Sequence, residues 1–364
     1  MNKQSDCFIN YINASAIVTR VLDGASGLDE AARLLIAGEI VAFPTETVYG
    51  LGADATQPAA VRKIFAAKGR PLDNPLIVHI ADIGAWYSLA HGIDDRALSL
   101  AREFWPGPLT IVLPRTDSVS DDITAGLGTV GVRMPSHPLA LELISRAGRP
   151  LAAPSANRSG KPSPTTAAET LADLFGIIPL ILDGGPCSVG VESTVITLAE
   201  DPPVLLRPGG VTAERLRAII PEMRIHPSAL AAVESNQPVP SPGIRHRHYS
   251  PNAKLTLVTG SPIDQRASLI RLYDNAIMMD QHPILLVCDE TADAISSRLC
   301  VRLGSRDNPE TIARGLFGAL REIDRQCADV AFGETYDANG IGLALMNRLL
   351  RAAGFRIEPS SPVR

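Results

Sequence analysis

The stretch IVAFPTETVYGLGADA, residues 40–55, gives the first clear sign of the fold. Its opening apolar run ends at Pro44, which favours a short buried strand over a helix. The chain then passes directly into hydroxyl side chains, a carboxylate and two glycines. Because glycine lets the backbone approach a ligand closely, this junction is a candidate binding loop. An ordinary turn with satisfied local hydrogen bonds explains the same composition equally well.

Other apolar runs bounded by Gly and Pro extend this pattern and predict further strands. These runs cover residues 75–80, 109–114, 129–135, 150–156, 180–185 and 193–199. Apolar residues at helical spacing predict helices over 28–38, 58–67 and 138–147, and Gly38 is placed to end the first of them. Since strands and helices do not alternate strictly, we expect an α/β fold with a twisted mixed sheet covered by helices.

The pattern breaks at residues 226–252, where a proline-rich segment without periodicity reads as a linker. It contains the basic run RHRHY, residues 245–249. Beyond it, short strands alternate with predicted helices over 308–326 and 341–354, which favours a small parallel α/β unit. The sequence therefore predicts a catalytic domain over 1–225, a linker over 226–252 and a second domain over 253–364.

Composition excludes several classes of protein. The net charge of −5 and the pI of about 5.8 argue against a protein that binds nucleic acid over its whole surface. The five cysteines are widely spaced, which is typical of free thiols in a reducing cytoplasm. No apolar stretch reaches the roughly 18 residues of a membrane helix. We therefore expect a cytoplasmic protein that is not inserted in a membrane.

Two cations and an amide follow the second predicted helix. Lys68 and Arg70 flank a glycine, an arrangement that suits a triphosphate, and Asn74 precedes a proline that holds it rigidly. The segment is not a Walker A loop, because GxxxxGK[ST] is absent. His79 lies near the end of an apolar strand, where a satisfied core histidine is the more common case.

Arg133 lies inside another apolar strand, and a buried arginine needs an anion. That anion is either a structural Asp or Glu or a substrate carboxylate. The loop over 153–166 is rich in hydroxyl groups and could donate to phosphate or carboxylate, although an ordinary polar loop has the same composition. Cys187 has no neighbouring base and is interpreted as a bystander.

Taken in order, these motifs resemble the Sua5/YrdC family of threonylcarbamoyl-AMP synthases. The matching segments are FPTETVYGLGADA, KGRPLDNPLIVH, FWPGPLTIVL, VGVRMPSHP, APSANRSGKPSPT, DGG…VESTV and LLRPGG. The segments SPGIRHRHYSP (241–251) and NGIGLALMNRLLRAAG (339–354) are similar to the longer, two-domain branch. The resemblance implies a YrdC-like twisted mixed sheet with flanking helices, followed by a smaller Rossmann-like α/β domain.

The resemblance also implies a reaction. L-Threonine, bicarbonate and ATP would give threonylcarbamoyl-AMP and pyrophosphate, the first step of the t6A modification of tRNA. Mg²⁺ would be carried by the nucleotide, with no metal site on the protein. The product would pass to a tRNA threonylcarbamoyl transferase complex.

Site residues follow from the motif positions. The threonine pocket would be Thr47, His79, Arg133, Ser155 and Ser193. The ATP site would be Lys68, Arg70, Asn74, Thr129, Ala153, Ser163, Arg207, Arg247 and Tyr249. Lys68 and Arg70 would be catalytic, and residues 241–251 would cover the pocket.

Two other readings compete with this one. An RNA-binding module without synthase activity could use Lys68, Arg70 and Arg133 along a phosphate backbone. A carbamoyl transferase is disfavoured, because the chain has no clusters of cysteine. Weak tRNA binding, the oligomeric state (monomer or dimer) and the role of the second domain stay open.

Overall fold

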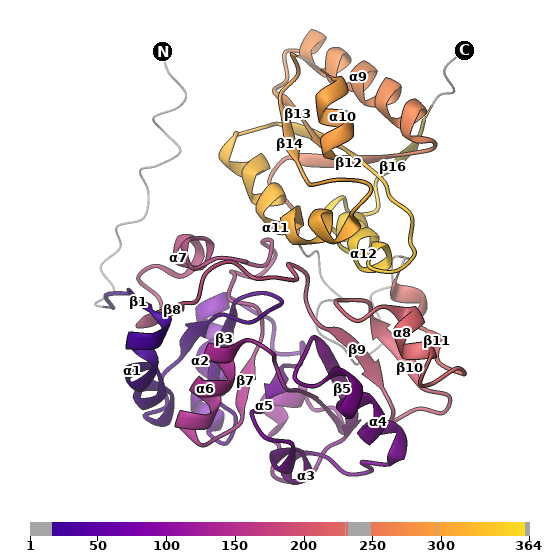
Figure 1. Ribbon diagram of the computed structural model, residues 1–364. Helices are drawn as coiled ribbons and strands as arrows, with labels where there is room; N and C mark the ends of the chain where they lie inside the picture. The colour runs from indigo at the N-terminus through magenta and orange to yellow at the C-terminus, as the bar shows by residue number, and fades with distance from the viewer. Residues whose placement is uncertain (1–16, 230, 232–248, 296, 361–364) are drawn as a thin grey trace.

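The structure is a computed structural model that describes residues 17–229, 231, 249–295 and 297–360. Two sheets organise the described chain (Figure 1). The larger has eleven strands within the described residues and mixes parallel with antiparallel pairs. In sheet order its strands are β1 (Arg20–Asp23), β8 (Leu180–Asp183), β2 (Val41–Phe43), β3 (Gly50–Asp54), β7 (Leu151–Ala153), β4 (Ile77–His79), β6 (Thr129–Arg133), β5 (Leu109–Pro114), β9 (Thr194–Thr197), β10 (Val204–Arg207) and β11 (Arg224–Ile225). This confirms the predicted mixed sheet.

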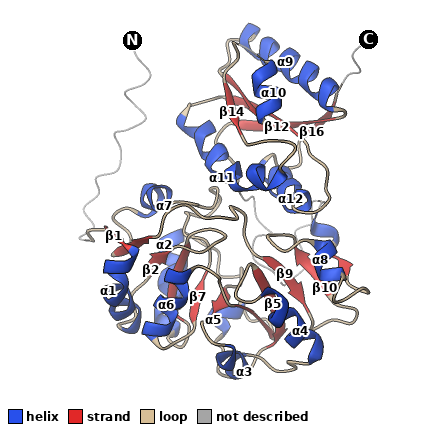
Figure 2. Cartoon of the chain, in the orientation of Figure 1, coloured by secondary structure: helices blue, strands red, loops and turns tan. Residues whose placement is uncertain are grey.

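Helices flank this sheet (Figure 2). They are α1 (Gly24–Ile36), α2 (Pro58–Lys68), α3 (Trp86–Leu89), α4 (Asp95–Phe104), α5 (Asp121–Thr124), α6 (Pro138–Ala147), α7 (Ala167–Leu174) and α8 (Ala213–Arg217), with 3₁₀ turns η1 (Ile83–Ala85) and η2 (Pro227–Ala229). Helix α6 has the predicted bounds, since a proline opens it and Gly148 ends it in the left-handed conformation. Gly38 has a φ of 79° just past α1, so its predicted role is also confirmed.

Strand β3 was read from the sequence as a glycine-rich loop, which is wrong. Phe43 on β2 is paired with Gly50 on β3 in antiparallel register. The Phe43 ring lies over both glycines of the strand, and a Cβ on Gly52 would come within 2.7 Å of that ring. Glycine in a strand often marks such a close approach of a neighbouring group. Because glycine has a low strand propensity, the sequence alone does not predict a strand here.

The second sheet is parallel throughout and has five strands in the described part of the chain. In sheet order they are β14 (Cys300–Arg302), β13 (Pro283–Val287), β15 (Val330–Glu334), β12 (Lys254–Thr259) and β16 (Ile357–Pro359), and the helices are α9 (Pro262–Met278), α10 (Asp289–Ala294), α11 (Pro309–Arg325) and α12 (Gly342–Ala352). The predicted Rossmann-like unit is thereby confirmed. Helices α11 and α12 face the larger sheet, whereas α9 and α10 lie on the far side (Figure 1).

The two parts share an apolar core. Val48 and Val191 from the first part of the chain, and Tyr249 from the linker, belong to the same buried cluster as Leu316 and Phe317 on α11. The second part therefore packs against the loop that follows β2 and against the loop before β9. No described helix is long and apolar enough to cross a membrane.

Candidate functional site

A cleft of about 730 Å³, partly open to solvent, lies where loops following β2, α2 and β7 meet the ends of β4, β6 and β10. Most of the predicted site residues line it, although they come from distant parts of the chain. The predicted residues in its wall are Thr47, Lys68, Arg70, His79, Arg133, Ala153, Ser155, Ser193, Arg207 and Tyr249.

The turn after β2 is organised by one hydroxyl group. Thr45 Oγ1 accepts the backbone N–H groups of Thr47 and Val48, both at 3.2 Å, and donates to the Val48 carbonyl at 2.6 Å. Such a side-chain-to-backbone turn fixes the chain locally. It points the carboxylate of Glu46 and the hydroxyl of Thr47 at the same neighbour, Arg133.

Arg133 ends β6 and is almost fully buried. Its NH1 donates to Thr47 Oγ1 at 2.9 Å, its Nε donates to the Gly107 carbonyl at 3.2 Å, and its NH2 lies 2.7 Å from Glu46 Oε1. Arg133 NH2 and Glu46 Oε1 are close but are not aligned for a hydrogen bond. Arg133 NH2 and both carboxylate oxygens of Glu46 therefore have no hydrogen-bond partner among the described residues. Arg133 is the member of this pair that lines the cleft, and its guanidinium is suited to hold a carboxylate.

His79 ends β4 beside Arg133, its Cα partner in the parallel register. Burial, with Arg133 nearby, lowers the pKa of the imidazole to about 3. Its Nδ1 has no hydrogen-bond partner in the described part of the chain. The side chain is therefore a neutral wall of the cleft at physiological pH.

The low pKa of His79 predicts how stability depends on pH. Between about pH 3 and 6.5 the unfolded chain binds a proton on this imidazole and the folded chain does not, so stability rises with pH and levels off above 6.5. We expect His79 to contribute about 2 kcal/mol to the loss of unfolding free energy from pH 7 to pH 5. Urea unfolding at the two pH values measures this, and His79→Asn should lose that contribution; an unchanged pH dependence in the variant would refute it.

Buried Lys68 and half-buried Arg70 form another wall. Lys68 Nζ donates to the carbonyls of Ser155 and Asn157, both at 2.5 Å. Arg70 donates from Nε to the Asn74 carbonyl at 3.2 Å and from NH2 to the Pro75 carbonyl at 3.0 Å. Burial lowers the pKa of Lys68 well below its usual range, and Arg70 adds to this effect. Burial lowers the pKa of Arg70 to about 10, so it stays charged at neutral pH.

A third cation, Arg207, ends β10. Its Nε and NH2 donate to the carbonyl and the hydroxyl of Ser193, each at 3.1 Å, and that hydroxyl also pairs with Thr110 Oγ1 at 2.8 Å. Burial lowers the pKa of Arg207 to about 10. Three cations in one partly closed cleft make a strongly positive surface, as a polyphosphate requires.

Some predicted residues lie beside the cleft. Asn74 is buried and supports Arg70 through its carbonyl. Thr129 lines a smaller neighbouring hollow, which shares residues 75–77 with the cleft. Ser163 donates to Glu192 at 2.7 Å. Arg247 lies outside the described residues, whereas Tyr249 lies within them and closes one end of the cleft.

Sequence reasoning missed Glu192 as a site residue. Burial disfavours its charge, but Arg348 and Arg207 outweigh burial and lower the pKa of the carboxyl to about 2. Its partner Arg348 lies 156 positions away in the sequence, so no local signal could have revealed the pair. Cys187 is buried, and burial raises the pKa of its thiol to about 12, which makes it a poor nucleophile.

Comparisons with known proteins show the family of this chain. A family model described as "Telomere recombination" matches residues 33–209, and one described as "Threonylcarbamoyl-AMP synthase, C-terminal domain" matches residues 211–354. A threonylcarbamoyl-AMP synthase of Bacillus subtilis is 48% identical over 329 residues, which cover 90% of this chain and 93% of that one. The chain belongs to the Sua5-type threonylcarbamoyl-AMP synthase family.

A second relative links the family to a solved structure. The threonylcarbamoyl-AMP synthase of Pyrococcus abyssi is also 48% identical, over 90% of this chain and 94% of its own. The crystal structure of P. abyssi Sua5 complexed with L-threonine superposes with a TM-score of 0.88 and 45% identity, and covers 95% of this chain and 99% of that one. The family likeness therefore extends over both sheets.

Proposed function

We propose that this chain is a threonylcarbamoyl-AMP synthase that joins L-threonine, bicarbonate and ATP and releases pyrophosphate. The observation that carries the proposal is the gathering of Arg133, Lys68, Arg70 and Arg207 in one cleft. One half of the cleft is complementary to an amino acid, and the other half is complementary to a triphosphate.

Threonine binds on the Arg133 side. The guanidinium holds the substrate carboxylate in the planar, two-bond geometry that arginine favours, and Glu46 holds the guanidinium in place through their ion pair. Thr47, Ser155 and Ser193 supply hydroxyl groups around the substrate, and neutral His79 packs against it. A proton-donating imidazole is not needed for this role.

The chemistry has two steps. The threonine amine attacks the carbon of bicarbonate, a C–N bond forms and water leaves, which gives N-carboxythreonine. An oxygen of the new carboxylate then attacks the α-phosphorus of ATP, and the bond to pyrophosphate breaks. Negative charge accumulates on the phosphates, and the fixed cations Lys68, Arg70 and Arg207 stabilise it. Positioning of the three substrates supplies much of the rate enhancement.

We further propose that Mg²⁺ arrives with the nucleotide. Glu192 lines the cleft and is already paired with Arg348, and Glu46 is already paired with Arg133. No group of three or more His, Cys, Asp or Glu side chains gathers as a metal site within the described residues. When bound, the ion would neutralise phosphate charge, and the protein's cations would hold the remaining phosphate oxygens.

The wider setting is part of the same proposal. The product would pass to a tRNA threonylcarbamoyl transferase complex in the cytoplasm for the t6A modification. We also propose the domain limits 1–225 and 253–364, with residues 226–252 as the linker. The larger sheet ends with β11 and the smaller one begins with β12, which supports these limits.

Tyr249 offers a test of how the linker side contributes. Its ring lies 5.1 Å from that of Phe317 and is buried, and its φ of 64° is unusual for a residue other than glycine. Burial raises the pKa of the phenol to about 12, so it is neutral during turnover. We expect Tyr249→Ala to lower kcat/KM about 100-fold, because the wall of the cleft loses its position, and Tyr249→Phe to lower it less than about 10-fold. Equal losses in the two variants would show that the hydroxyl, not the packing, matters.

A pyrophosphate-release assay tests the proposed function. Release should require threonine, bicarbonate and ATP together and should be unaffected by added RNA. An RNA-binding module without synthase activity would show RNA binding and no release, and that outcome would overturn the proposal.

A further inference from the structure

Two arginines of the second part of the chain are buried against the first part. Arg321 lies on α11 and Arg348 lies on α12, and the side chain of Arg348 is 0% exposed. Buried arginines are rare unless they are paired. Both find their partners across the interface, in residues that surround the cleft.

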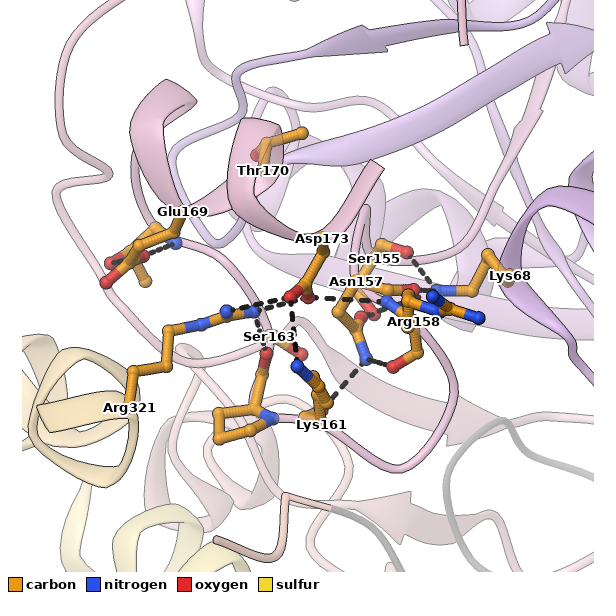
Figure 3. A network of polar contacts seen from close by, with 12 residues as sticks. Lys68, Ser155, Asn157, Arg158, Lys161, Ser163, Glu169, Thr170, Asp173 and Arg321 are labelled. Carbon is orange, nitrogen blue, oxygen red and sulfur yellow. Dashed lines mark hydrogen bonds and ion pairs between the residues drawn. The ribbon is translucent and has the colours of Figure 1, made fainter. Parts of the chain in front are cut away.

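Arg321 holds one end of the loop that follows β7. Its guanidinium donates to the two carboxylate oxygens of Asp173 at 3.2 and 2.8 Å and to the Pro162 carbonyl at 2.5 Å (Figure 3). Asp173, on α7, also accepts the backbone N–H of Arg158 at 3.3 Å and lies 3.9 Å from Lys161 Nζ. The guanidinium, the carboxylate and the loop over 158–162 therefore form one connected network.

The same loop encloses Lys68. Its ammonium donates to two carbonyls of the loop, those of Ser155 and Asn157, and the Ser159 N–H donates back to the Lys68 carbonyl at 2.9 Å. The Asn157 amide then ties the loop to itself through the carbonyls of residues 158 and 161, both at 2.8 Å. A displacement of the loop would therefore move the Lys68 ammonium with it (Figure 3).

Arg348 holds the next residue of the same loop, Ser163, through Glu192. Its Nε donates to Glu192 Oε2 at 2.9 Å, and the other oxygen of Glu192 accepts the hydroxyl of Ser163 at 2.7 Å. Its NH1 donates to the Pro208 carbonyl at 2.6 Å, directly after Arg207. Adjacent residues 162 and 163 are thus fixed from two helices of the second part, and Arg207 is fixed by one of them.

We propose that Arg321 and Arg348 are positioning residues for the ATP side of the cleft. They act through the loop over 155–163 and through Glu192, and they aim Lys68 and Arg207 at the phosphates. The inference rests on the proposed function and deepens it, because it makes the second part of the chain a component of the nucleotide site as well as the anchor of the linker.

The test compares Arg321→Met and Arg348→Met with a matched control, Arg314→Met. Arg314 also lies on α11 and also crosses the interface, where its Nε donates to the Ser188 carbonyl at 2.9 Å in an exposed contact. Calorimetry with α,β-methylene-ATP measures nucleotide affinity without turnover. Steady-state assays of the full chain separate KM for ATP, KM for threonine and kcat.

We expect the affinity for the analogue and kcat/KM for ATP each to fall about 10- to 100-fold in Arg321→Met and Arg348→Met, as displacement of a binding group by about 1 Å does elsewhere. KM for threonine should change less than kcat/KM for ATP, because Arg133 and Thr47 lie outside the loop over 155–163. Arg314→Met should behave like the unaltered chain, because its contact is with Ser188 and not with that loop. Arg321→Lys and Arg348→Lys should recover part of the loss, since an ammonium can reach one of the acceptors but does not have the fork of a guanidinium.

Unchanged analogue affinity in both methionine variants would overturn the inference. An equal loss in Arg314→Met, or an equal loss of threonine affinity, would also overturn it, because general docking of the two parts would then be the cause. If a methionine variant does not fold, the lysine variant decides, and a folded lysine variant with unchanged affinity and kcat counts against the inference. The analogue measurement needs no threonine or bicarbonate, so it stays decisive even if the unaltered chain makes no threonylcarbamoyl-AMP.

Discussion

Replacement of Arg133 by alanine should lower kcat/KM for threonine in pyrophosphate release by at least about 30-fold. The variant loses the cation that holds the substrate carboxylate and leaves Glu46 buried without its partner. Removal of one member of a buried charge pair typically costs about 2–5 kcal/mol, which corresponds to roughly 30- to several-thousand-fold in affinity. The measurement is KM for threonine and kcat at saturating ATP.

Two companion variants separate binding from folding. Arg133→Ala with Glu46→Gln removes the unpaired charge and should regain thermal stability without regaining activity. Arg115→Ala, which breaks an exposed contact with Asp121, should leave both unchanged. A threonine KM near that of the unaltered chain in Arg133→Ala would remove this residue from the threonine site.

Lys68→Met should lower kcat/KM for ATP about 100- to 1000-fold, because it removes a preorganised cation from the phosphate side. Threonine binding measured without ATP should persist. The folded pKa of Lys68 lies below its unfolded value, so the folded state opposes the charge that the unfolded chain carries at neutral pH. Methionine has no charge to bury, so this cost is absent from the variant, and its melting temperature should stay the same or rise.

Lys63→Met is the matched control, because Lys63 lies on the same helix but forms an exposed ion pair with Glu39. It should leave turnover unchanged. Nearly full activity in Lys68→Met would show that Arg70 and Arg207 suffice, and that the assignment of Lys68 is mistaken.

Local chemistry predicted much of the fold. Helix α6 covers the predicted residues 138–147, and the apolar run over 109–114 is β5 with the predicted bounds. Strand β3 was not predicted, because glycine has a low strand propensity. Its glycines are needed because the Phe43 ring on the neighbouring strand leaves little room for a side chain. Such a reason exists only in three dimensions.

The candidate site divides in the same way. Arg133 attracted attention in the sequence because a buried arginine needs an anion, and the structure supplies Glu46 from the turn after β2. Arg348 and Arg321 gave no such signal, because each reads as one charge on the surface of an amphipathic helix. Their partners lie about 150 residues earlier in the sequence, so only the docking of the two sheets reveals them.

The most direct test of the central claim follows the carbon of bicarbonate. The purified chain is incubated with radiolabelled bicarbonate, threonine and ATP. The nucleotide products are then separated, and their masses are determined by mass spectrometry. The account predicts label in a product with the mass of threonylcarbamoyl-AMP, formed in equal amount with pyrophosphate and only when threonine and ATP are both present. Pyrophosphate release without label in a nucleotide product, or label uptake without threonine, would contradict it.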